Sequence, residues 1–395
     1  MGKYNFDILV DRGEFKARKW NMTDLNDSGD FGENIIPMGM ADMDFLCAPK
    51  IQEAIKDVAS HGIYGYTYVH DEFYNSIINW NDRRHNSKIA KEWITLTHGT
   101  VSTLHYIVQE FCEKGDNVLI QSPAYDPFYN AIARGGANPI YNRLVLSCGR
   151  YEIDFKDLEE KLSDEKTTLM IFCSPHNPTG RVWEKGEVLA IASLCKKHNV
   201  LLVSDEINRE LMLYGNKHTP IIETTQEIKN NTILCTSPNK AFNLGGLKSS
   251  YTIIPNKKIR DRLKKRLENN SITSPNIFVI PSVTTAYNEC EDWLEELIEY
   301  VEGNLDYLRE FLKTRIKGIK LIEPEGSYLA WLDFRQIESD PVKLEEFNLN
   351  VAKIKFCEGY TFVENGDGFA RINLGCPRSI LEEALNRLEI AVKNR

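Results

Sequence analysis

Three clusters of polar residues follow short apolar segments in the middle of the chain, and their side chains can hold and use a charged organic cofactor. They are segments 174–180 (Ser-Pro-His-Asn-Pro-Thr-Gly), 204–206 (Ser-Asp-Glu) and 236–240 (Thr-Ser-Pro-Asn-Lys). In an open parallel sheet, ligands bind beyond the carboxyl ends of the strands. We therefore expect the three clusters to converge on one crevice.

Lys240, Asp205 and Asn177 in one crevice have the side chains needed to bind pyridoxal 5′-phosphate (PLP). This cofactor needs a lysine for its Schiff base and a carboxylate that keeps its pyridine nitrogen protonated. Each residue alone has a simpler interpretation: 177–180 is a turn signal, Asp205 suits a helix N-cap, and Lys240 suits a solvated loop. Their shared position after apolar segments, in one half of the chain, favours a common site.

The segments that must position these residues alternate between strand and helix patterns. Helical spacing of apolar residues is found at 48–60 and 184–198. Continuous apolar runs suit strands buried on both faces. This alternation predicts an α/β domain with a largely parallel sheet. The runs, each bounded by Gly, Pro, Ser or Asn, are 93–96, 117–120, 168–172, 200–203, 232–235 and 251–254.

The C-terminal third has a different pattern. A long amphipathic helix is predicted at 293–312, strands at 328–334 and 369–374, and a final helix at 381–392. This mixture indicates a smaller α+β domain.

Composition and missing motifs exclude several functions. The 395 residues include 48 basic and 57 acidic side chains, which give a net charge of −9 and no dense basic face for nucleic acid. The chain lacks the phosphate-loop, zinc-protease, nucleophile-elbow and dinucleotide motifs, and its eight histidines show no metal-ligand spacing, so we predict no metal site. Nine scattered cysteines, no secretion signal and no run long enough to span a bilayer predict a cytoplasmic protein.

The sequence also resembles a known family. Segments 174–181, 204–207 and 237–248 look like the landmarks of fold-type I PLP enzymes, the aspartate aminotransferase superfamily. Segments 41–45 (Ala-Asp-Met-Asp-Phe), 61–67 and 174–183 are similar to its MalY/PatB branch of cystathionine β-lyases, also called C–S lyases. The resemblance extends from about Met38 to Arg378.

The resemblance implies the fold and its assembly. A large PLP-binding domain at 47–290 would have a mainly parallel sheet sandwiched by helices. A smaller α+β domain would be formed by 1–46 and 291–395. It also implies a homodimer in which Tyr66 reaches the neighbouring subunit's cofactor phosphate.

The resemblance assigns roles to the residues around the cofactor ring. Lys240 would form the Schiff base and later move protons at the substrate Cα, and Asp205 would pair with the pyridinium nitrogen. Asn177 would bond the phenolic oxygen and Tyr125 would stack on the ring. Asn208 stands where the branch usually has His and many aminotransferases have Tyr, and it is shorter and does not titrate.

Other residues would hold the phosphate and the substrate. Gly99, Thr100 and Val101 open a helix where free N–H groups suit a phosphate, which Ser237 and Lys248 would also contact. The usual loop begins Pro-Gly-Val-Val, whereas this chain has His98-Gly99-Thr100-Val101. The substrate α-carboxylate would be bound by Arg371, together with Asn177.

The predicted reaction is β-elimination from cystathionine or a related S-substituted L-cysteine, which gives a thiol, pyruvate and ammonia. The nearest alternative is an aminotransferase acting on an L-amino acid, which shares the first steps. A non-catalytic binding or regulatory protein is a further alternative, and an NAD oxidoreductase is disfavoured by the missing glycine fingerprint.

Overall fold

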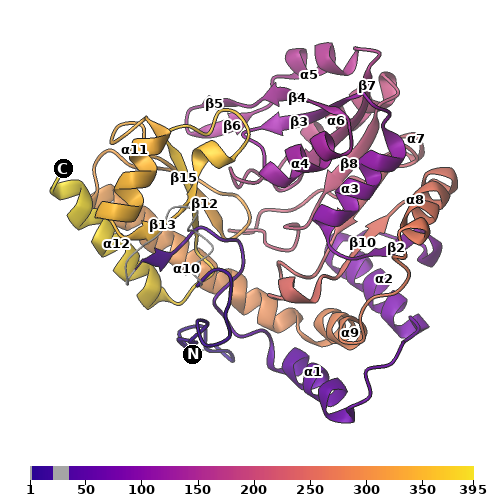
Figure 1. The fold of residues 1–395 in the computed structure, drawn as a ribbon, viewed down its shortest axis with the longest axis horizontal. Helices are drawn as coiled ribbons and strands as arrows, with labels where there is room; N and C mark the ends of the chain where they lie inside the picture. The colour runs from indigo at the N-terminus through magenta and orange to yellow at the C-terminus, as the bar shows by residue number, and fades with distance from the viewer. Residues whose placement is uncertain (1, 21–34) are drawn as a thin grey trace.

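A seven-stranded sheet forms the centre of the larger part of the molecule (Figure 1). The structure is a computed structural model and describes residues 2–20 and 35–395. The strand order is β2-β10-β9-β8-β7-β3-β4. The strands are β2 (Ile94–Thr97), β3 (Asn117–Ser122), β4 (Asn138–Arg143), β7 (Thr167–Cys173), β8 (Leu201–Asp205), β9 (Thr232–Thr236) and β10 (Ser250–Ile253).

The strand directions bring the predicted clusters to one edge. Neighbouring strands are parallel except at β10, which is antiparallel to both β2 and β9. Strand β2 therefore runs in the same direction as β9. The carboxyl ends of β2, β3, β7, β8 and β9 consequently lie at the same edge of the sheet.

Helices cover both faces of this sheet, which explains its continuous apolar strands. Val118 and Ile171 belong to a buried cluster shared with α3, α4 and α8, whereas Leu119 and Met170 belong to one shared with α5 and α6. Successive side chains of a strand point to opposite faces, so both faces need apolar residues. The helices are α1 (Pro49–His61), α2 (Asp71–His85), α3 (Thr100–Phe111), α4 (Asp126–Arg134), α5 (Phe155–Leu162), α6 (Lys185–Lys197), α7 (Gln226–Lys229), α8 (Lys257–Asn269) and α9 (Val279–Glu289).

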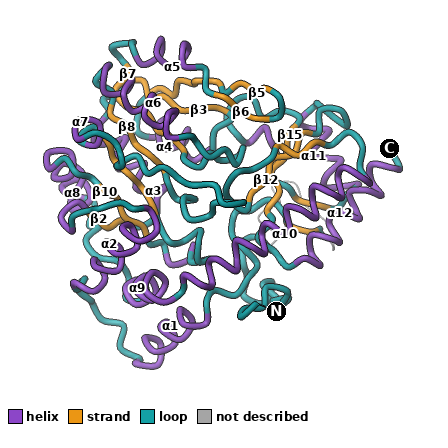
Figure 2. Tube along the Cα trace, turned by 180° about the vertical axis from the view of Figure 1, so that it is seen from behind, coloured by secondary structure: helices purple, strands orange, loops and turns teal. Residues whose placement is uncertain are grey.

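A second, four-stranded sheet lies near the C-terminus, with α10 and α12 running side by side next to it (Figure 2). Its order is β11-β12-β15-β14, and all neighbours are antiparallel. The elements are α10 (Glu291–Arg315), β11 (Lys320–Ile322), β12 (Leu329–Asp333), α11 (Pro341–Glu346), β14 (Cys357–Glu358), β15 (Phe369–Asn373) and α12 (Arg378–Lys393).

Two short pairs of strands lie outside these sheets. Strand β1 (Ile36–Pro37) runs parallel to β13 (Ile354–Lys355), so the N-terminal part joins the C-terminal part. Strands β5 (Val145–Ser147) and β6 (Arg150–Glu152) form a hairpin. The β1–β13 pair is in keeping with a small domain made of 1–46 and 291–395, and the proposed boundaries stay a prediction.

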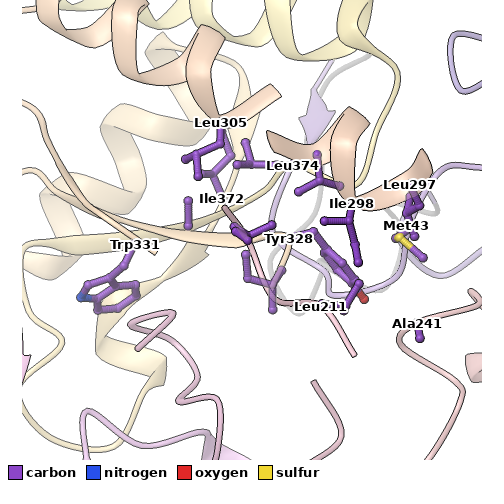
Figure 3. Close-up of a cluster of buried hydrophobic side chains, with 14 of the residues drawn as sticks. Met43, Leu211, Ala241, Leu297, Ile298, Leu305, Tyr328, Trp331, Ile372 and Leu374 are labelled. Atoms are coloured by element: carbon purple, nitrogen blue, oxygen red, sulfur yellow. The ribbon is translucent and has the colours of Figure 1, made fainter. Parts of the chain in front are cut away.

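One buried cluster connects α10, the second sheet and the site (Figure 3). Figure 3 shows Met43 beside Leu297 of α10, with Ala241 on the same side of the view. Met43 and Ala241 directly follow Asp42 and Lys240 in the chain. The other labelled members are Leu211, Leu297, Ile298, Leu305, Tyr328, Trp331, Ile372 and Leu374.

Every strand and helix that the sequence patterns predicted is present, with ends displaced by a few residues. Strand β4 was not predicted, because its sequence, Asn-Pro-Ile-Tyr-Asn-Arg, contains no continuous apolar run. It lies at the edge of the sheet. Within the described residues, no helix has the length and apolar character needed to cross a membrane.

Candidate cofactor and substrate site

A cavity of about 490 Å³ opens at the shared carboxyl edge of the sheet. Its walls come from the segments that follow β2, β3, β7, β8 and β9, as the sequence predicted. The predicted site residues that line it are Gly99, Thr100, Val101, Tyr125, Asn177, Asp205, Asn208, Lys240 and Lys248.

Lys240 follows β9 and projects its amine into this cavity. The Nζ atom donates a hydrogen bond to the carbonyl oxygen of Ala41 at 2.5 Å. Burial lowers the pKa of Lys240 to about 8, and the positive charge of Arg371 acts in the same direction. At the usual pKa of 10.5 almost no lysine is neutral near pH 7. The lowered pKa of Lys240 leaves a usable fraction of its free amine near neutral pH.

Asp205 is the last residue of β8 and is only 5% exposed. Its Oδ1 accepts a hydrogen bond from the Ile207 N–H at 3.2 Å. Burial raises the pKa of Asp205 to about 7, although the Ile207 N–H favours the ionised form. The residues in register on either side are Cys173 and Cys235, which carry no counter-charge. A cation placed against this carboxylate would therefore be strongly favoured.

An anion-binding corner is formed at the start of α3. Gly99 has φ +102°, a left-handed conformation that side chains rarely adopt, and Thr100 begins the helix. The first N–H groups of a helix have no partner inside it, so they are available to a phosphate. Lys248 also lines the cavity and brings a positive charge.

Ser237 and Tyr66 do not line the cavity of this chain. The Ser237 hydroxyl donates to the Ser249 carbonyl at 2.6 Å and accepts the Asn239 N–H at 3.0 Å. Asn239 lines the cavity instead, and the sequence argument missed it. Tyr66 is fully exposed in the segment between α1 and α2, beside the exposed Tyr64 and Tyr68. The predicted contacts of Ser237 and Tyr66 with a phosphate stay predictions.

Arg371 lies on β15 and lines a second cavity of about 440 Å³, which shares Ala41 and Tyr125 with the first. The side chain is 3% exposed, with Nη1 donating to Asn177 Oδ1 and Nη2 to the Gly39 carbonyl, both at 2.9 Å. Its Nε is buried with no hydrogen-bond partner in the described part of the chain. A carboxylate would satisfy this donor.

Asn208 and Tyr125 complete the lining. Asn208 is 5% exposed, and its Oδ1 is buried without a hydrogen-bond partner among the described residues. Tyr125 ends the loop after β3 and caps α4. Its ring meets Phe128 edge-on at 5.7 Å between centroids, which fixes one flat aromatic face beside the cavity.

Residues 39–44 form a wall to which sequence reasoning assigned no role. The carbonyl oxygens of Gly39 and Ala41 accept hydrogen bonds from Arg371 and Lys240. The Met40 carbonyl oxygen accepts one from Asn373 Nδ2 at 2.6 Å. The available signal was the Ala41–Phe45 motif, which was used only for the resemblance. Because its partners are about 200 to 330 residues away in the chain, spacing could not reveal their contacts.

The donor set fits PLP. The buried Asp205 would be stabilised in its ionised form by a cationic ring nitrogen, the α3 corner and Lys248 suit a phosphate, and Lys240 is a partly neutral amine. The side-chain amide of Asn208, which can donate a hydrogen bond, and the flat face of Tyr125 suit a polar aromatic ring. No group of three or more residues suited to hold a metal ion occurs among the described residues.

The family model described as "Aminotransferase class I and II" matches residues 33–388. The chain belongs to this family. It is 38% identical to cystathionine β-lyase PatB of Bacillus subtilis, over 98% of this chain and all of the relative, and 31% identical to the protein MalY of Escherichia coli, over 99% of each. The structure of cystalysin from Treponema denticola, which contains PLP, superposes with a TM-score of 0.95 at 35% identity, covering 99% of both chains.

These matches confirm the predicted superfamily, its MalY/PatB-like branch and the fold.

Proposed function

We propose that the protein is a PLP-dependent C–S β-lyase that converts cystathionine or a related S-substituted L-cysteine into a thiol, pyruvate and ammonia. The observation that carries this proposal is the joint placement of Lys240, Asp205 and Arg371 around connected cavities, in a chain similar over its whole length to a cystathionine β-lyase.

The substrate is oriented by Arg371 and by the residues that hold it. A guanidinium binds a carboxylate through parallel hydrogen bonds, and the free Nε of Arg371 offers such a donor. Asn177 and the Gly39 carbonyl hold the two terminal nitrogens, which restricts the direction of the guanidinium plane. An α-carboxylate bound there places the substrate between Arg371 and Lys240.

Bound PLP supplies an electron sink for the pair of electrons left when the substrate Cα–H bond breaks. Lys240 takes the proton from Cα, because its lowered pKa leaves part of the amine unprotonated at neutral pH. Asp205 is the carboxylate that would keep the pyridine nitrogen cationic. Tyr125 would stack on the ring, and Asn208 and Asn177 would contact its phenolic oxygen. The α3 corner at Gly99–Val101, Ser237 and Lys248 would hold the phosphate.

The active unit in this proposal is a homodimer in the cytoplasm. The aromatic segment that carries Tyr66 is exposed, and a second copy would cover it while receiving Tyr66 at its own phosphate corner. All nine cysteines are free thiols, which is typical of a reducing compartment. The proposed large domain is 47–290, and the small domain is 1–46 with 291–395.

Product analysis tests the reaction. The PLP-loaded protein is incubated with cystathionine and with a series of S-alkyl-L-cysteines, and thiol, pyruvate and ammonia are measured separately. The proposal predicts equal amounts of all three from at least one substrate. An aminotransferase would instead give an oxo acid that keeps its sulfur. The absence of thiol and pyruvate across the series would contradict the proposal.

A further inference from the structure

The Ala41–Phe45 motif lies against the amine of Lys240, and the roles proposed above leave its two aspartates, Asp42 and Asp44, unused. The Ala41 carbonyl accepts hydrogen bonds from Lys240 Nζ at 2.5 Å and from the Tyr328 hydroxyl at 3.0 Å. The next residue, Asp42, lines a cavity of about 660 Å³ together with Lys240 and Tyr125. A carboxylate thus lines the same cavity as the proposed base.

The two oxygens of Asp42 have different surroundings. Oδ2 forms a salt bridge with Arg12 Nη2. Oδ1 is buried and has no hydrogen-bond partner among the described residues. Although 33% of the Asp42 side chain is exposed, Oδ1 itself is covered. A positive charge that forms nearby would therefore be stabilised by an anionic oxygen that no hydrogen-bond donor among the described residues neutralises.

The backbone of Asp42 is held firmly from several directions. Its carbonyl accepts hydrogen bonds from Asn373 Nδ2 at 2.8 Å and from Lys19 Nζ at 3.2 Å. The following Met43 is buried in the cluster of Figure 3, which also holds Ala241 next to Lys240. The backbone segments that carry Asp42 and Lys240 are therefore anchored to the same buried core.

Four charged residues influence the pKa of Lys240 in addition to its burial. Arg371 and Lys248 lower its pKa, whereas Asp42 and Asp205 raise it, and Asp42 has the larger effect of the two carboxylates. Asp42 itself faces Arg12, Lys240 and the Tyr328 hydroxyl. Arg12 also binds Asp44, which is paired with Lys19.

We propose that Asp42 is the positioning residue for Lys240: it stabilises the ammonium form of this lysine and sets the pH at which the free amine appears. Asp205 is committed to the cofactor, so Asp42 is the carboxylate left to balance the charge created at Lys240. Arg12 tunes this effect by neutralising Asp42 in part. The inference rests on the proposed role of Lys240 as the base at Cα.

The proton balance shows where this charge appears. The Cα–H bond breaks and Lys240 gains the proton, so a neutral amine becomes an ammonium. The electron pair left at Cα then forms a Cα=Cβ double bond while the Cβ–S bond breaks, and the sulfur leaves with the Cβ–S bonding electrons as a thiolate. Lys240 returns the proton to this thiolate and becomes neutral again. Asp42 favours the first transfer, because its negative charge stabilises the positive charge that forms on Lys240.

Two variants with opposite effects on charge test the inference. Asp42→Asn removes the negative charge at nearly constant size, whereas Arg12→Gln removes the partner and leaves Asp42 less neutralised. With each PLP-loaded protein, exchange of the Cα hydrogen of L-alanine for deuterium is followed by NMR as a function of pH. The midpoint of the pH titration of the bound cofactor's visible absorption is measured alongside. Alanine has no leaving group, so this assay reports proton removal alone.

We expect the acid-side midpoint of exchange and the absorption midpoint to move down by about one pH unit in Asp42→Asn. In Arg12→Gln both midpoints should move up, and Asp42→Glu should keep them near the original values. A purely structural role predicts shifts in the same direction for the two charge variants, or none, and either result would overturn the inference.

Thermal unfolding and cofactor content establish that each variant is folded. If Asp42→Asn fails to fold, the upward shift in Arg12→Gln and the retained midpoints in Asp42→Glu decide the question, and a downward or absent shift in Arg12→Gln contradicts the inference. Failure of the lyase proposal is seen separately, because alanine exchange would persist in a protein that releases no pyruvate from any thioether.

Discussion

The site has two walls that are built in different ways. The cofactor wall comprises Gly99–Val101, Asn177, Asp205, Asn208 and Lys240, which all follow strands of one sheet. The substrate wall comprises residues 39–44 and Arg371, which come from opposite ends of the chain. The first wall is a product of sheet topology. The second exists only after the N-terminal segment and the second sheet have packed together.

This difference separates two tasks. The cofactor wall holds groups whose charges match a phosphate and a pyridinium ring. The substrate wall binds the α-carboxylate and, through Asp42, controls the charge on Lys240. Variants in the first wall should therefore change cofactor binding and spectra, whereas variants at Arg371 should change substrate affinity and leave the cofactor spectrum alone.

Lys240 belongs to the cofactor wall and its amine contacts Ala41 of the substrate wall, so its loss should have the largest effect. Lys240→Ala removes the base at Cα, and we expect turnover to fall by about 10⁴-fold, at the upper end for a positioned base. Steady-state pyruvate release measures the effect, and reduction with borohydride followed by mass spectrometry checks that the cofactor is no longer covalently held. Turnover within tenfold of the original protein would exclude Lys240 as the base.

Asp205→Asn tests the cofactor wall. The amide keeps the size of the side chain but removes the charge, so we expect turnover to fall by roughly 100-fold through loss of a charged hydrogen bond. Cofactor affinity, measured by equilibrium dialysis, should weaken in parallel. Asp261→Asn, at an exposed position of α8, serves as a matched control in which the same exchange is made at a residue that does not line the cavity.

Arg371→Lys tests the substrate wall. Lysine keeps the charge but loses the planar pair of donors, so KM should rise roughly 10-fold while cofactor absorption stays unchanged. A change in cofactor absorption with an unaltered KM would contradict the claim that Arg371 acts on the substrate and not on the cofactor.

The smallest expected effect concerns stability without cofactor. The pKa of Asp205 is raised from 3.8 to about 7, so between these values the folded protein binds the proton that the unfolded chain has released. Stability due to this group should fall as pH rises from about 4 to 7 and then level off. Asp205→Asn should remove that part of the pH dependence, which thermal unfolding of the cofactor-free protein at several pH values would show. An identical pH dependence in both proteins would contradict the burial argument.

The contrast between the walls also explains what the sequence could predict. The apolar runs before Asn177, Asp205 and Lys240 predicted strands, and parallel strands place their ends together, so these three residues of the cofactor wall followed from local patterns. The roles of Gly99–Val101 and Asn208 came from the resemblance. Arg371 was found only through the resemblance, because nothing in its own strand indicates a partner at Asn177. No sequence pattern indicated a role for Asp42. Its segment meets Lys240 through the hydrogen bond between Lys240 and the Ala41 carbonyl, which joins residues about 200 positions apart.

Two other expectations depend on contacts that residue order does not specify. The phosphate contact of Ser237 stays a prediction, and in this structure its hydroxyl bonds the Ser249 carbonyl and the Asn239 N–H. A side chain's choice between a loop carbonyl and a ligand depends on loop geometry, which residue order does not specify. Tyr66 is exposed, and its proposed contact needs a second chain.

The number of pyruvate molecules formed per active site, in the absence of any added oxo acid, tests the central claim most directly. A β-lyase restores its cofactor in every cycle, so cystathionine or another active thioether should yield many equivalents of pyruvate per site, with an equal amount of thiol. An aminotransferase would stop after at most about one equivalent of oxo acid per site, because its cofactor retains the amino group. A plateau at one equivalent, with no thiol released, would contradict the account.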